Sequence, residues 1–337
     1  MSKRKYFRKT AWLVSVSFIF CMVITLSVAD TASAERQFIR FGGSNPGGSW
    51  FTIAGGITAL FNREIPNFNA SPVATGGSVD CNRQARKHNL DTWLSHSLHA
   101  YDNWTGTGIF EGQGPFHGFR FVAGVYESWH HFVTLEKNPI YKIEDLKGKK
   151  IAVGSAGSGA AANSENILRV LGIWEHLTPM HLTFGASGRA LADGHADAIG
   201  MSSAPMPAVV TVEAMHKIRL IELTDAQLDK CIAKYPAYKK AVMPAGTYKS
   251  WTKPYNAIGF QVYWMAHEKT DPEAVYMMLK TAFSEKNKEF LAKVHKNLKN
   301  LSLPLQGMEQ MGIPMHLGAV KYFKEQGMSI PANLIVD

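Results

Sequence analysis

Short apolar runs alternate with longer stretches of helical spacing along the chain, and this alternation predicts an α/β protein. Each β-rich run is followed by a polar or glycine-rich turn and then by a helical stretch, the order typical of parallel strands joined by helices. The predicted strands are 38–41, 70–74, 92–94, 120–125, 130–135, 151–153, 181–184, 198–201, 217–222 and 257–266. The predicted helices are 50–63, 79–88, a short one ending near Trp104, 160–171, 188–193, and a largely helical remainder from Pro272 to about Gln326.

The first 34 residues have the pattern of a secretory signal peptide. An apolar run from Ala11 to Ala29 is followed by Asp30 and by Ala32-Ser33-Ala34, a small-residue cleavage sequence. The run approaches the ~20 residues of a membrane-spanning helix, so an uncleaved anchor is the alternative. Because Asp30 and the small residues interrupt the run where a peptidase would cut, we favour cleavage after Ala34 and a periplasmic mature protein.

The net charge is smaller when the predicted signal peptide is left out. The whole chain of 337 residues carries a formal charge of +9, but the segment 1–34 holds five of its 36 basic and one of its 27 acidic residues, which leaves +5. No arginine-rich stripe accompanies that charge, so nucleic acid is not an expected partner. A hydrophobic fraction of 46% is enough for a buried core, and the length suits about two domains.

Two cysteines, Cys81 and Cys231, remain after the signal segment. An oxidising compartment permits a disulfide between them. Two arbitrary positions seldom meet the ~5.5 Å Cα separation that a bridge needs, so two buried free thiols are the favoured interpretation.

Turns rich in glycine and serine precede three of the predicted helices, at 42–50, 75–79 and 154–160. Glycine allows the backbone to approach a ligand closely, and the first N–H groups of a helix are unsatisfied donors at the positive end of its dipole. One such turn is common in α/β proteins for structural reasons alone. Three in one chain indicate a site for an anion such as a carboxylate or phosphate.

Motifs for catalysis or cofactor binding are missing from these turns. The stretch GSAGSGAA (154–161) lacks the Lys-Ser/Thr ending of a phosphate loop, and the sequence contains no G-x-S-x-G elbow. His96, His99, His130 and His131 do not have the spacing of a zinc site. We therefore expect no enzyme activity, no cofactor and no metal. Trp50, at the start of the first helix, is expected to form a wall of any ligand cavity.

Several longer stretches resemble one known family, the TAXI family of TRAP transporter solute receptors, in order and over nearly the whole chain after residue 34. The stretches that carry the resemblance are 41–84, 100–112, 145–168, ALADGHADA (190–198), AKYPAY (233–238), MPAGTY (243–248) and 303–327. The resemblance implies a two-lobed periplasmic-binding-protein fold of type II-like topology, with a mixed, mostly parallel sheet and flanking helices in each lobe. Lobe one would contain 35–137 and 251–337, and lobe two 138–250.

The resemblance also implies a function. A small carboxylate, such as glutamate, glutamine or a related dicarboxylate, would bind between the lobes of a monomer and pass to TRAP permease subunits driven by an ion gradient. Matching the family's motifs position by position gives the expected ligand-binding residues: Ser44, Gly48, Ser49, Trp50, Thr75, Gly77, Ser78, His96, Ser97, Ser155, Gly157, Ser158, Gly159, Ser202 and Ser203.

Three positions depart from the family's usual residues. His96 stands where the family often has Gln, Trp50 where it commonly has Tyr, and Ala160 where it often has Thr. These changes alter the number of hydrogen-bond donors. The resemblance therefore predicts the class of ligand better than it predicts which compound of that class binds. Two other functions stay open: a sensor that passes the bound state to a signalling partner, and an exported hydrolase with His96 as base, Ser97 or Ser49 as nucleophile, and Asp91 or Asp102 as the orienting acid.

Overall fold

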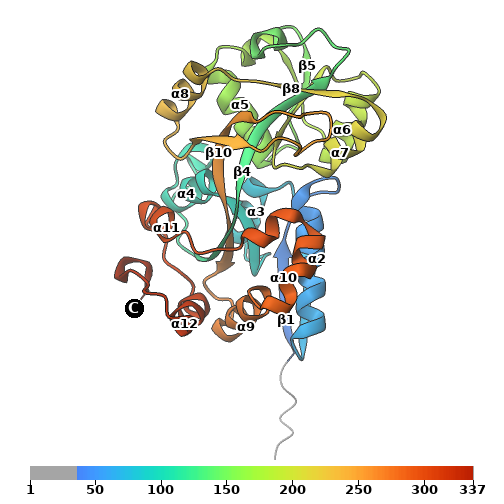
Figure 1. Ribbon diagram of the computed structural model, residues 1–337. Coiled ribbons are helices and arrows are strands. Elements are labelled where there is room, and N and C mark those ends of the chain that lie inside the picture. The colour runs from blue at the N-terminus through green and yellow to red at the C-terminus, as the bar shows by residue number, and fades with distance from the viewer. Residues whose placement is uncertain (1–35, 337) are drawn as a thin grey trace, which may run out of the picture. The chain divides into compact units, whose positions relative to one another are not determined.

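Strands and helices alternate through most of the chain (Figure 1). The computed structural model describes residues 36–336, so the signal peptide expected at 1–34 lies outside the described residues. The strands are β1 (Gln37–Gly42), β2 (Phe68–Val73), β3 (Thr92–His96), β4 (Phe119–Leu135), β5 (Lys150–Ala152), β6 (Thr178–Met180), β7 (Ala198–Ser202), β8 (Ile218–Ile221), β9 (Lys239–Met243) and β10 (Tyr255–His267). From Phe38 onward the chain forms one compact unit.

The helices lie between and after these strands. They are α2 (Ser49–Glu64), α3 (Ser78–Arg86), α4 (Ser97–Thr105), α5 (Gly159–Val170), α6 (Phe184–Ala192), α7 (Pro207–Met215), α8 (Asp225–Lys234), α9 (Pro272–Ala282), α10 (Glu285–Val294), α11 (Leu305–Met311) and α12 (Leu317–Glu325). Helix α9 begins as its sequence predicts: the Asp271 carboxylate accepts from the Glu273 N–H, and Pro272 occupies the first turn, where an N–H has no helical partner.

One mixed sheet joins all the strands, in the order β2-β1-β3-β10-β4-β7-β5-β6, with β8 beside β4 and β9 beside β10. The outer pairs β1–β3, β5–β6 and β5–β7 are parallel. The long strands β4 and β10 are antiparallel to each other and to their neighbours. The α/β class with flanking helices is therefore confirmed, but the expected predominance of parallel pairing holds only for the outer strands.

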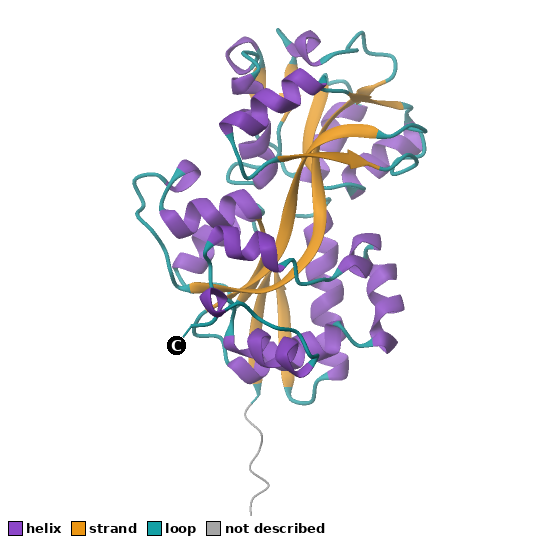
Figure 2. Cartoon of the chain, turned by 60° about the vertical axis from the view of Figure 1, so that its left-hand side comes forward, coloured by secondary structure: helices purple, strands orange, loops and turns teal. Residues whose placement is uncertain are grey.

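The buried side chains separate into three groups along β4 and β10. The first core is built from residues between Ile39 and Tyr126 and between Val262 and Leu334. The second core lies between Val133 and Ala257, and the third between Phe132 and Phe260 together with Leu98. Strands β4 and β10 run side by side from the first core to the other two, as Figure 2 shows.

Three sequence predictions differ from the structure, and three of its elements have no counterpart in the prediction. The strand expected at 181–184 is wrong, because β6 ends at Met180 and Phe184 already begins α6. The two strands expected at 120–125 and 130–135 are one continuous strand, β4. Helices α7 and α8 and strand β9 were not predicted. After Pro272 the chain forms several short helices with 3₁₀ turns.

Both cysteines are free and buried, as favoured from the sequence. Cys81 belongs to the first core and Cys231 to the third, which explains why they do not meet. Within residues 36–336, no helix is long and apolar enough to cross a membrane.

Candidate functional site

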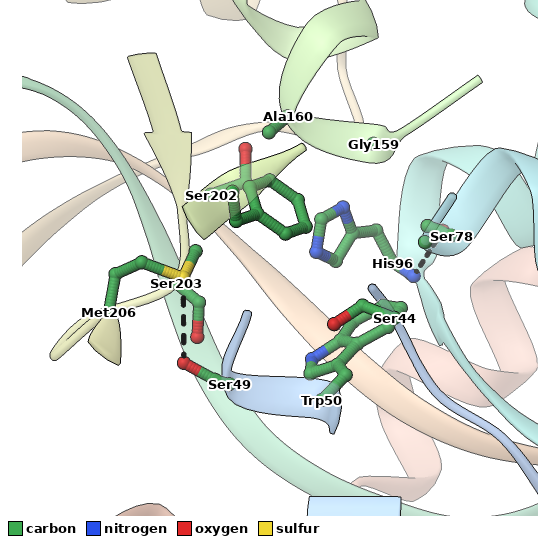
Figure 3. A pocket seen from close by; sticks show the side chains of 12 residues that line it. Ser44, Ser49, Trp50, Ser78, His96, Gly159, Ala160, Ser202, Ser203 and Met206 are labelled. Atoms are coloured by element: carbon green, nitrogen blue, oxygen red, sulfur yellow. Dashed lines mark hydrogen bonds between the residues drawn. The ribbon is translucent and has the colours of Figure 1, made fainter. Parts of the chain in front are cut away.

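A small cavity lies where the starts of four helices converge. The space open to the centre of a water molecule is only about 20 Å³, and about 290 Å³ is free of protein atoms when the open mouth is counted. Helices α2 and α3 reach it from the first core, and α5 and α6 from the second and third (Figure 3). The residues that line it are Ser44, Ser49, Trp50, Gly77, Ser78, His96, Gly159, Ala160, Phe184, Ser202, Ser203 and Met206.

The first glycine-rich loop, 42–49, brings α2 to the cavity. The Ser44 hydroxyl accepts from the Phe51 N–H at 3.1 Å and so holds the loop against the first turn of α2. Gly48 has no room for a side chain, because a Cβ there would lie 2.4 Å from Ser44 Oγ and 2.7 Å from the Phe184 ring. The loop can therefore close on α6 only with glycine at this position.

Hydrogen bonds of the Thr75 hydroxyl hold the second glycine-rich loop, 75–78, in place. Thr75 Oγ1 donates to the Gly43 carbonyl at 2.8 Å and accepts from the Gly77 N–H at 3.0 Å. Gly77 has a φ of +118°, a conformation that favours glycine. The Ser78 hydroxyl accepts from the His96 N–H at 2.9 Å. Thr75 thus shapes the loop without lining the cavity, whereas Gly77 and Ser78 line it.

His96 occupies the centre of the site. Its side chain is 3% exposed, and its Nδ1 atom has no hydrogen-bond partner within residues 36–336. Burial, with smaller contributions from the neighbouring His99 and His130, holds the pKa of His96 well below its usual value, so the ring is neutral. A Cβ on Gly159 would lie 2.7 Å from His96 Nδ1, so only glycine allows the two segments to come this close.

Trp50 forms part of the wall of the cavity. Its indole N–H donates to the Tyr126 hydroxyl at 2.8 Å, and that hydroxyl lies 3.1 Å from Ser203 Oγ. The Trp50 ring also meets the His96 ring edge-on, with centroids 4.9 Å apart. The indole orientation is therefore fixed by a hydrogen bond at one edge and by ring packing.

The loop before α5 holds the structure together beside the cavity. Ser158 caps α5 by accepting from the Ala161 N–H at 3.0 Å. Ser155 Oγ accepts from Asn45 Nδ2 at 2.6 Å, and the Gly157 carbonyl accepts from the Asp80 N–H at 2.9 Å. Ser155, Gly157 and Ser158 therefore act as contacts between loops and as a helix cap.

Ser202 and Ser203 complete the wall at the end of β7. Ser202 Oγ lies 2.7 Å from His130 Nδ1 and accepts from Asn163 Nδ2 at 3.0 Å. The Ser203 hydroxyl faces Tyr126, as described above. The Ser202 hydroxyl is thus oriented by two buried partners, as a preorganised binding group would be.

Nine of the expected ligand-binding residues line this cavity: Ser44, Ser49, Trp50, Gly77, Ser78, His96, Gly159, Ser202 and Ser203. The other six do not line it: Gly48, Thr75, Ser97, Ser155, Gly157 and Ser158. Five of these six shape the loops around the cavity. Ser97 instead lines a larger groove on the other side of the His96–Phe260 contact, together with Tyr101 and Tyr238.

Sequence reasoning left three lining residues out of the expected set. Ala160 was recognised only as a departure from the family's pattern. Phe184 was assigned to a strand, although the small residues Gly185, Ala186 and Ser187 after it suit a helix start. Met206 follows two serines and a proline, and its sequence neighbours carry no signal of a cavity wall.

No Asp, Glu, Lys or Arg is among the twelve lining residues. The polar groups of the site are therefore hydroxyl groups, a neutral imidazole and the N-termini of helices. The partial positive charge of the helix N-termini favours an anion. Over the part of the chain that the structure describes, no group of three or more His, Cys, Asp or Glu residues could hold a metal ion.

Several solved structures and one family model are similar to this chain. A solved structure described as a periplasmic transporter is 15% identical, with a TM-score of 0.51 over 86% of this chain and 95% of its own. The aliphatic sulphonate binding protein SsuA of Escherichia coli is 14% identical, with a TM-score of 0.44 over 88% and 96%. The alkanesulfonate-binding SsuA of Xanthomonas axonopodis pv. citri is also 14% identical, with a TM-score of 0.47 over 89% and 96%. The model of the NMT1-like family matches residues 41–327, and the chain belongs to that family.

Proposed function

We propose that this protein is an extracytoplasmic solute receptor that binds a small carboxylate and delivers it to a TRAP permease driven by an ion gradient. The observation that carries the proposal is the cavity itself: helix starts, hydroxyl groups and an unpartnered buried His96 Nδ1 surround a space without any charged side chain. The helix N–H groups and the hydroxyl groups are donors that suit an anion that must later be released, because they bind it less strongly than a desolvated arginine pair would.

The two-lobed organisation is part of this proposal. Lobe one, 35–137 and 251–337, would contain the first core, and lobe two, 138–250, most of the second and most of the third. Strands β4 and β10 would form the hinge. Four hydrogen bonds join the first glycine-rich loop to α6, to α7 and to the turn before α7. They are Phe184 N to Asn45 Oδ1 at 3.0 Å, Gly185 N to the Pro46 carbonyl at 3.2 Å, Ala208 N to the Gly47 carbonyl at 3.1 Å, and Ser49 Oγ to the Pro205 carbonyl at 3.1 Å. These bonds fit a closed state that a ligand would stabilise.

The hydrolase alternative lacks its orienting acid in this geometry. The Asp91 carboxylate is bound by the Arg40 guanidinium at 2.8 and 2.9 Å. Asp102 is near the end of α4 and accepts from the Ile109 N–H at 3.4 Å. Since neither carboxylate orients His96, the arrangement favours binding over catalysis. A sensor with the same ligand remains the second candidate, and neighbouring genes for a multi-span permease or for a sensor kinase would distinguish the two functions.

Thermal-shift screening of the exported protein tests the proposal. Small carboxylates are compared with their uncharged carboxamides as matched controls. A ligand at 100 times its Kd adds about 2.7 kcal/mol of stability, so a specific carboxylate should raise the melting temperature clearly while its amide does not. Mass spectrometry of the recovered ligand should show it unchanged. If no carboxylate stabilises the protein, or if the ligand is converted, the receptor proposal is wrong.

A further inference from the structure

The cavity wall contains no charged side chain, and this limits which carboxylates the cavity can bind. Amino acids carry an ammonium group next to the carboxylate, and a buried ammonium needs an acidic partner or it loses its hydration without compensation. The cavity has serine hydroxyls, aromatic rings and backbone at its surface, and no lining residue is acidic. A cation over the Trp50 ring would be compensated only in part, because cation–π attraction is weaker than the hydration of an ammonium group.

Three acidic residues near lining residues in the sequence, Asp80, Asp91 and Asp102, have other partners. Asp80 Oδ2 accepts from the Gly76 N–H at 2.8 Å, which orients it back toward its own loop at the start of α3. The Asp91 carboxylate pairs with Arg40, and Asp102 lines the groove beside Tyr101. None of these carboxylates lines the cavity.

The only ionisable side chain in the wall is His96, and it is neutral and deeply buried. A neutral imidazole nitrogen can pair with a hydroxyl or a keto group through either tautomer, but it does not neutralise an ammonium ion. The helix starts add partial positive charge on the same side, which attracts a carboxylate and repels a cation. Hydroxyl oxygens, the imidazole and the Trp50 ring compensate a buried ammonium only in part, and no lining side chain supplies a counter-charge, so the wall favours a simple anion over a zwitterion.

We infer that the ligand is a small carboxylate with a hydroxyl, a keto group or no substituent where an amino acid has its ammonium group. This inference rests on the proposed receptor function and narrows its ligand class. It removes glutamate and glutamine from the expected ligands and keeps their deaminated counterparts.

Matched ligand pairs test the inference by isothermal titration calorimetry on the exported protein. The pairs are L-glutamate with 2-oxoglutarate, 2-hydroxyglutarate and glutarate, and L-alanine with pyruvate, L-lactate and propionate. The best deaminated member should bind at least tenfold more tightly than its amino acid. An amino acid that binds as tightly as its deaminated partners, or more tightly, overturns the inference but leaves the receptor function standing. If no compound of either kind binds, the inference and the receptor proposal both fail.

A charge placed in the wall gives a second, independent test. Ser44 is 3% exposed, lines the cavity and accepts from the Phe51 N–H in the first turn of α2, and the side chains of Asp and Asn also carry an oxygen that can accept. Ser44→Asp should shift the ratio of amino-acid to deaminated affinity at least tenfold toward the amino acid. Ser44→Asn, whose side chain matches that of Asp in size without the charge, is the control and should not show this tenfold shift. Equal ratios in the two variants would contradict the inference.

Discussion

The proposed closure of the site depends on the close approach of α5 to the His96 ring, and a single methyl group can test it. Gly159 is the first residue of α5, and a Cβ at this position would lie 2.7 Å from His96 Nδ1 and 3.0 Å from His99 Cε1. Both rings are buried, at 3% and 1% exposure, so neither can turn away freely. Gly159→Ala therefore forces α5 away from the end of β3.

The size of the effect follows from packing energies. Inserting a methyl group into a filled contact costs about 1–3 kcal/mol. The clash arises only when α5 of the proposed lobe two meets β3 of lobe one, so the penalty applies to the closed state and not to an open one. With tenfold in Kd for every 1.4 kcal/mol, ligand affinity should fall by roughly 5- to 150-fold. Unfolding of the ligand-free open protein should change by less than about 0.5 kcal/mol.

Calorimetry with the best carboxylate from the thermal-shift screen measures this loss. Gly55→Ala is the matched control, because no atom lies within 4 Å of a Cβ at that position in α2. That variant should keep the Kd and gain up to about 1 kcal/mol of stability from helix propensity. A Gly159→Ala protein whose Kd stays within twofold of the unmodified protein would refute the argument that closure brings α5 onto His96.

Three further predictions follow from the contacts of the site. Ser49→Ala removes the hydrogen bond to the Pro205 carbonyl and should weaken ligand binding several-fold in calorimetry, with unchanged affinity counting against the closed-state interpretation. Ser158→Ala removes the α5 cap and should lower chemical-denaturation stability by about 1 kcal/mol, which an unchanged midpoint would contradict. Burial lowers the pKa of His99 to about 3 and of His131 to about 4, so both take up a proton on unfolding below pH 6.5 and stability falls as pH decreases. From pH 7.5 to 5 each should cost about 2 kcal/mol, offset by about 1.4 kcal/mol from Asp102, whose pKa burial raises to about 6. A calorimetric melting temperature that does not fall over this range would be evidence against the buried neutral rings.

The local parts of the fold were predictable from the sequence because each depends on a few neighbouring residues. The glycine-rich turn at 42–49 and the Asp271-Pro272 start of α9 both appear where their residues indicate. The continuity of β4 was not predictable, since Glu127 and Ser128 interrupt its apolar run and are accommodated through pairing with β10. That pairing joins residues more than 120 positions apart, which no local pattern encodes.

Some residues of the candidate site were likewise predictable from the sequence, and others were not. Ser49, Ser78 and Gly159 follow from the rule that helix starts in such folds face a common cleft. Ser155 and Ser158 match the same rule, but the Ser155 hydroxyl accepts from the Asn45 side chain and the Ser158 hydroxyl caps α5. Only the folded chain reveals these interactions. The absence of charge in the wall likewise became visible only when residues from four helices and two strands came together.

A crystal structure of the exported protein with the tightest-binding carboxylate tests the central claim most directly. The account predicts carboxylate oxygens within hydrogen-bond distance of the first N–H groups of α2, α3 or α5, beside His96, with no acidic side chain touching the ligand. A ligand bound in the groove of Tyr101 and Tyr238, or one held by a charged side chain, would contradict it.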